Sequence, residues 1–240
     1  MKINMTFALI LCAKFFVFSQ NPSAKQILKN AINYHDPNGN WSAFNNTFTV
    51  EMTTPNASLR RSDITINLPH NYFNVEATKD SIITTYTINK GKCQLAYNKT
   101  VLDSTQAATK KMSCDRARLY KDYYTYLYGL PMKLNDPGTH LSDTVENKTF
   151  KGKDYFVLKV SYDEAVGSDV WYFYFNVTTY AMDIYQFYKT DENGEEITDS
   201  GEYILLSEES LINGIKMPKV RAWYYNKDDM YLGTDTLVDN

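Results

Sequence analysis

The amino-acid sequence predicts a mainly β fold in which two groups of antiparallel strands are separated by one helical insertion. Aromatic residues make up 15% of the 240 residues, and such residues favour the pleated surface of strands. Apolar and polar residues alternate from 47 to 102 and again after 150, as in strands with one buried face. Residues 103–129 lose this alternation and show helical spacing. We therefore expect about ten strands in a single domain, residues 20–240.

The first 19 residues have the features of a secretory signal peptide. Lys2 precedes an apolar run from Phe7 to Phe18, and Ser19 stands at the expected cleavage site. The run is too short to cross a membrane comfortably. Lipid anchoring at Cys12 is not expected, because Leu11 stands where a small residue should precede a lipidated cysteine. We therefore expect export across the inner membrane and removal of residues 1–19.

An amphipathic helix is expected to open the mature chain. Ser23 is a suitable N-cap, and the apolar face that follows is formed by Ile27, Leu28, Ala31 and Ile32. The turn residues 37–39 end this helix. His35 and Asp36 therefore lie at its C-terminal end.

A second helix is expected within residues 103–129, and it is unusually rich in tyrosine. Its aromatic residues cover both faces, and Gly129 and Pro131 mark its end. A helix that is apolar all round is buried on more than one side. If one side meets the sheet, we expect the other to meet a lid, a partner or a ligand.

The strands after residue 150 are expected to form hairpins around Asn193-Gly194 and Asn213-Gly214. Two of these segments, 171–175 and 220–225, are apolar on both faces. Such strands need cover on both sides of the sheet. The two helical segments are the candidates to cover the inner side.

Two cysteines, Cys93 and Cys114, remain after the signal peptide. One lies in a predicted strand and the other at the start of the second helix. An oxidising compartment would allow them to form a disulfide. Two separately buried thiols are the alternative, because pairing does not follow from sequence alone.

Charge and motif content exclude several classes of function. The net charge is −3, and no run of Lys and Arg exceeds a pair, so we expect no nucleic-acid partner. The sequence contains no Walker phosphate-binding loop, no Gly-x-Gly-x-x-Gly motif, no Gly-x-Ser-x-Gly elbow and no His-Glu-x-x-His motif. Its three histidines lie far apart, so we expect neither a metal site nor a cofactor.

His35 and Asp36 are the one polar pair with a possible catalytic use, since an aspartate can orient a histidine base. The alternative is a structural helix end, where the helix dipole favours histidine and Asp-Pro begins a turn.

Four segments carry a resemblance to known proteins: "NYHDPNGNW", "YYTYLYGLPMKLNDPGT", "VGSDVWYFYFN" and "NGIKMPKVRAWYYN". They resemble a family of secreted Bacteroidota proteins classed as a domain of unknown function, which implies a location in the Gram-negative envelope, in the periplasm. The second half is also similar to the lipoprotein-carrier superfold of the LolA and LolB proteins. This likeness implies a strongly curved antiparallel half-barrel of about 10–11 strands, with helices plugging its concave face around a hydrophobic cavity.

These observations favour a non-enzymatic periplasmic carrier or binding protein for a lipid, an acyl chain or a lipoprotein. We expect it to be a monomer. An envelope protein–protein interaction module is the first alternative, and a hydrolase or lyase using His35 and Asp36 is the second. The residues that we expect to line the cavity are Tyr123, Tyr124, Leu127, Met132 and Trp171.

Overall fold

The computed structural model describes residues 22–238, so the predicted signal peptide lies outside the described residues. The helices are α1 (Ala24–His35), α2 (Ser104–Thr109) and α3 (Cys114–Gly129), with two 3-10 helices, η1 (Asn40–Ala43) and η2 (Met132–Asn135). The strands are β1 (Asn45–Thr54), β2 (Ala57–Asn67), β3 (Tyr72–Lys79), β4 (Ile82–Asn89), β5 (Lys92–Tyr97), β6 (Thr100–Val101), β7 (Thr139–Phe150), β8 (Lys153–Tyr162), β9 (Val170–Asn176), β10 (Met182–Tyr188), β11 (Glu202–Ile212), β12 (Ile215–Tyr225) and β13 (Tyr231–Val238).

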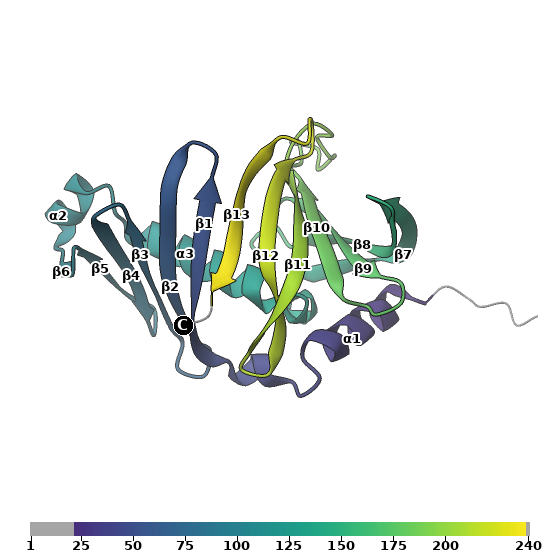
Figure 1. Cartoon of the computed structure of the whole chain (residues 1–240), viewed down its shortest axis with the longest axis horizontal. Helices are drawn as coiled ribbons and strands as arrows, with labels where there is room; N and C mark the ends of the chain where they lie inside the picture. Colours follow the sequence, from purple (N-terminus) through teal and green to yellow (C-terminus); the bar gives the residue numbers. More distant parts are fainter. Residues whose placement is uncertain (1–21, 239–240) are drawn as a thin grey trace, which may run out of the picture.

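All of these strands belong to one antiparallel sheet, in the order β6-β5-β4-β3-β2-β1-β13-β12-β11-β10-β9-β8-β7. Two meanders, β1–β6 and β7–β13, are joined where β1 pairs with β13. Figure 1 shows the curvature of the sheet and the position of α3 across one of its faces. The predicted curved, mainly β architecture is confirmed.

The described residues contain thirteen strands, more than the ten or eleven expected. The two additional strands, β6 and β7, are the edges of the sheet. β6 has only two residues and cannot display a period. In β7 the pairing register shifts between Leu141 and Val145, which interrupts the alternation. Both strands therefore lack the pattern that identifies a half-buried strand.

Helix α3 lies between distant parts of the sheet. Tyr120 packs against Tyr86 of β4, with ring centroids 5.1 Å apart. On another side of the helix, Tyr126 contacts Trp171 of β9, with ring centroids 5.8 Å apart. Because β4 and β9 lie near opposite edges of the sheet, the sheet must curve around α3, which occupies its concave face.

Both ends of α3 are held against neighbouring elements. At its first residue, Cys114 forms a disulfide with Cys93 of β5, which was one of the two alternatives for these cysteines. At its last residue, a Cβ atom on Gly129 would lie 2.3 Å from the Trp41 ring. Glycine is therefore needed here for a close approach between the helix and η1.

A charged side chain is buried beneath α3. Arg221 of β12 is 1% exposed, and its guanidinium carbon lies 3.9 Å from the centre of the Tyr128 ring. Its Nη1 donates a hydrogen bond to the Pro218 carbonyl at 2.9 Å. Asp235 of β13 lies opposite Arg221 in the register and is also buried. Burial raises the pKa of Asp235, and the positive charge of Arg221 opposes this rise.

His35 joins α1 to the sheet. Its Nε2 accepts a hydrogen bond from the Met182 N–H of β10 at 3.0 Å, so Nδ1 carries the proton and donates to the Lys216 carbonyl of β12 at 2.7 Å. The imidazole is buried and neutral, and burial lowers its pKa. Asp36 caps η1 by accepting hydrogen bonds from the N–H groups of Asn40 and Trp41, each at 2.8 Å.

We expect Arg221→Met to lower the free energy of unfolding by about 3 kcal/mol at neutral pH, because it removes the strongest compensation of the buried Asp235 carboxylate and leaves only Arg60 and a hydrogen bond from Trp223. A raised folded-state pKa means that the carboxyl contributes stability at low pH that is lost as the pH rises through that pKa. Without Arg221 that loss should be larger. Urea unfolding at about pH 4.5 and pH 8 should therefore show a smaller deficit at the lower pH.

Arg61→Met on β2 is the matched control, because it is the same substitution at an arginine whose ion pair is exposed, with Glu51 at 2.9 Å. We expect it to change stability by less than about 1 kcal/mol. An equal loss for Arg221→Met at both pH values would contradict the coupling to Asp235.

We expect His35→Ala to lower the free energy of unfolding by about 3 kcal/mol, because the Met182 N–H and the Lys216 carbonyl both lose a buried partner.

The lowered pKa of His35 predicts that wild-type stability falls as the pH drops below about 6.5, where the unfolded chain binds the proton first. His35→Gln retains a donor and an acceptor and does not titrate. The stability difference between wild type and His35→Gln should therefore change between about pH 7.5 and pH 5, whereas parallel curves would refute this account.

Candidate functional site

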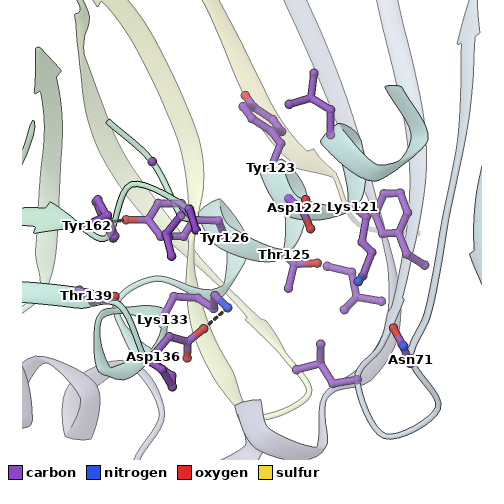
Figure 2. A pocket seen from close by; sticks show the side chains of 18 of the residues that line it. Asn71, Lys121, Asp122, Tyr123, Thr125, Tyr126, Lys133, Asp136, Thr139 and Tyr162 are labelled. Carbon is purple, nitrogen blue, oxygen red and sulfur yellow. Dashed lines mark hydrogen bonds and ion pairs between the residues drawn. The ribbon is translucent and has the colours of Figure 1, made fainter. Parts of the chain in front are cut away.

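An open cavity of about 760 Å³ lies beside α3 on the concave side of the sheet. Three walls enclose it, as Figure 2 shows: the end of the β2–β3 hairpin, the outer side of α3, and the region from η2 to β9. Its apolar and aromatic lining residues are Ile66, Leu68, Tyr72, Phe73, Leu119, Tyr123, Tyr126, Pro137, Tyr162, Ala165, Val166 and Trp171. A volume of several hundred cubic ångströms with such walls is typical of a small-molecule site.

Tyr123 and Trp171, both predicted as cavity residues, line this cavity. Tyr123 is 38% exposed, yet surrounding protein raises the pKa of its hydroxyl well above the usual value through burial. A side chain that is partly exposed but has protein around its hydroxyl, as Tyr123 has, is typical of a cavity wall. Its ring stacks on Trp223 of β12, with centroids 6.4 Å apart, so the wall is continuous with the sheet.

The other three predicted lining residues, Tyr124, Leu127 and Met132, lie elsewhere. All three are buried in the core, and none lines the cavity. Tyr124 and Leu127 share the stripe of α3 that packs on the sheet, where Tyr124 stacks on Phe73 of β3. Neighbouring tyrosines of one helix point in directions about 100° apart. Tyr123 therefore faces the cavity while Tyr124 faces the core.

Trp171 belongs to a packed group of aromatic rings. It stacks on Phe187 of β10 with centroids 4.9 Å apart, and on Phe173 with centroids 5.9 Å apart. It also contacts Tyr126 of α3 and Tyr185 of β10. Rings packed on several sides have little rotational freedom, so this wall is formed before any ligand arrives.

Nine of the 22 lining residues are polar or charged, and two pairs of lining side chains interact with each other. Lys133 and Asp136 of the η2 region form an ion pair, which Figure 2 shows at one side of the cavity. The hydroxyl groups of Tyr126 and Tyr162 bond to each other. Burial raises the pKa of Asp169, which favours its neutral form. The cavity therefore combines apolar and aromatic walls with polar groups that can orient a ligand.

None of the residues that line this cavity is a histidine, cysteine or serine. Within residues 22–238, no group of three or more His, Cys, Asp or Glu side chains is placed to hold a metal ion.

His35 and Asp36 do not form the polar site that was considered from sequence. Both imidazole nitrogens are engaged by backbone groups, and both carboxylate oxygens of Asp36 cap η1. Asp36 therefore does not orient the imidazole, and no lone pair of His35 is available as a base. The structural alternative, a helix end, describes this pair.

The sequence did not reveal two groups of residues: those that line the cavity from loops, and the charged residues that are buried in the core. Leu68 and Val166 line the cavity from outside regular strands, where periodicity gives no signal. Arg221 and Asp235 had a detectable signal. Arg221 is two residues from Trp223, and Asp235 is two residues from Leu237, so each shares the inward face of its strand with an apolar side chain.

No α-helix in residues 22–238 has the length and the apolar character that a membrane span requires.

This chain is similar to two solved structures. One is the crystal structure of a LolA superfamily protein from Nitrosomonas europaea, with 13% sequence identity and a TM-score of 0.54 over 91% of this chain and 93% of that chain. The other is a DUF1329 family protein from Desulfovibrio piger, with 8% identity and a TM-score of 0.48 over 90% and 91% of the two chains. The first likeness establishes a LolA-like fold.

No curated protein matches the sequence of this chain. The sequence does match, over residues 4–240, the model of a family of unknown function, and the chain accordingly belongs to the DUF6503 family.

Proposed function

We propose that this protein is a non-enzymatic binding or carrier protein for an apolar ligand, such as a lipid, an acyl chain or the acylated part of a lipoprotein. The observation that carries the proposal is the open cavity beside α3, with Tyr123 and Trp171 in its walls. Burying a ligand's apolar surface there gains about 25 cal/mol per Å². The preformed aromatic wall reduces the ordering cost of binding.

The fold supports the same proposal. The structural neighbour from Nitrosomonas europaea is a LolA superfamily protein, and the second half of this chain resembles the LolA and LolB lipoprotein carriers in sequence. A curved sheet with a helix across its concave face separates an apolar compartment from water. We propose that this chain holds its apolar ligand on the concave face of the sheet, with α3 as one wall of the compartment.

The proposed location is the periplasm of a Gram-negative bacterium of the Bacteroidota, reached through the signal peptide at residues 1–19. The Cys93–Cys114 bond supports an oxidising compartment, because disulfides persist there and are rare in the cytosol.

Protein–protein interaction is a second candidate, and one observation favours it. Leu119 and Val166, on two walls of the cavity, are 65% and 58% exposed. Exposed apolar side chains around a hollow also suit contact with another protein. Size-exclusion chromatography with light scattering discriminates between the two, since a stable oligomer that dissociates in Leu119→Glu would favour the interaction module.

The carrier proposal predicts that the purified protein binds N-phenyl-1-naphthylamine, an uncharged apolar fluorophore, and that Tyr123→Glu weakens this binding by about 10-fold or more. A carboxylate in the wall must be desolvated when an apolar ligand enters, which is costly. Fluorescence titration gives the Kd of each variant, and urea unfolding verifies that each is folded.

Tyr231→Glu is the matched control, because Tyr231 is 37% exposed, almost the same as Tyr123, and does not line the cavity. We expect its Kd to equal that of the wild type. Absence of binding to the wild type, or equal weakening by both substitutions, would rule out this cavity as the ligand site.

A further inference from the structure

A second cavity, of about 590 Å³, lies between α1, η2 and the first residues of β7. It is adjacent to the first cavity, because Asp136 and Thr139 line both. In Figure 2 these two residues lie at the edge of the first cavity, on the side away from the β2–β3 hairpin. The concave side of the molecule therefore offers two neighbouring compartments instead of one.

The floor of the second cavity is apolar. Leu28 and Ile32, one turn apart on α1, face Leu134 of η2 and Leu141 of β7 across it. Leu28 and Leu134 are part of the buried core, and Ile32 and Leu141 pack against it. A bound molecule would meet fixed hydrophobic surface here.

The charged side chains around this floor leave an excess of positive charge, because the others are paired within the protein. Asp136 is neutralised by its ion pair with Lys133. His140 pairs with Asp163, with 2.6 Å between Nε2 and Oδ1. Lys25 and Lys29 remain.

Lys25 and Lys29 lie one turn apart on α1, both exposed, and neither has an ion pair with another residue of the range 22–238. Two uncompensated positive charges therefore border an apolar cavity in a chain whose net charge is −3. Such charges raise the local concentration of anions and favour a negative group at this place.

We propose that the second cavity holds the anionic head group of a single-chain amphiphile whose hydrocarbon chain lies in the cavity beside α3. This inference rests on the proposed function and specifies its ligand class. The shared residues Asp136 and Thr139 mark the place where the chain passes from one compartment to the other.

The chemistry of the two lysines defines which head groups fit. An ammonium group is a compact point charge that donates hydrogen bonds to carboxylate and phosphate oxygens alike. A guanidinium, by contrast, selects planar partners that bind in a bidentate way. No arginine lines the second cavity. The site therefore takes a carboxylate or a phosphate monoester, and net negative charge is the property it recognises.

The test uses displacement of N-phenyl-1-naphthylamine by three probes with the same chain length: laurate, dodecyl phosphate and uncharged monolauroylglycerol, each below its micelle concentration. We compare the wild type with the double variant Lys25→Gln/Lys29→Gln. The matched control is Lys79→Gln/Lys92→Gln, which removes the same charge from two exposed positions that line neither cavity.

We expect Lys25→Gln/Lys29→Gln to weaken laurate and dodecyl phosphate by about 5-fold, as expected for the loss of two solvent-exposed charge contacts. Binding of monolauroylglycerol should not change, and the control variant should match the wild type with all three probes. The ranking of laurate and dodecyl phosphate in the wild type identifies which anion the site prefers.

If all three probes bind the double variant as tightly as the wild type, the head-group site is wrong while the carrier proposal stands. If the control variant weakens the anionic probes equally, net charge and not this cavity is responsible, and the inference is again overturned. If no probe binds the wild type, the proposed function itself fails.

Discussion

The structure depends on one constraint of chain connectivity: β6 and β7 are consecutive strands in the sequence but form opposite edges of the same sheet. A flat sheet of thirteen strands would be about 58 Å wide. The segment that connects β6 and β7, residues 102–138, includes α3, whose 16 residues span about 24 Å. A curved sheet brings its two halves closer together, and the connecting segment then lies across the concave face. The disulfide from Cys114 to β5 fixes where this crossing begins.

This position explains the unusual composition of α3. One stripe of the helix packs into the sheet, where Tyr128 lies between Phe48 and the Arg221 guanidinium. The next side carries Tyr123 and Tyr126, which contact Trp223 of β12 and Trp171 of β9 and form part of the cavity wall. Tyrosine suits both environments, since its ring provides apolar area and its hydroxyl tolerates a wet edge. A dry core and an accessible compartment are thus built from the same helix.

Periodicity predicted most of this fold because most central strands have a buried face that alternates with a more exposed one; β9 is the exception and is buried on both faces. It failed at the edges, where β6 is too short and β7 is interrupted by a register shift. The tyrosine-rich helix was also predictable, but the side of it that faces a cavity was not. Tyr123 and Tyr124 are adjacent and chemically identical, and only the position of the sheet determines which is buried. Likewise, the backbone partners of His35 lie on β10 and β12, which are 147 and 181 residues away in the sequence.

The central claim is that the concave face carries an apolar ligand, and it is tested most directly by asking what the protein carries when isolated. The protein should be purified without detergent from the envelope fraction of its host, extracted with organic solvent and analysed by mass spectrometry. The account predicts co-purifying acyl-chain lipid in the wild type and much less in a folded Tyr123→Glu variant. Ligand-free wild-type protein, or equal lipid in both samples, would contradict it.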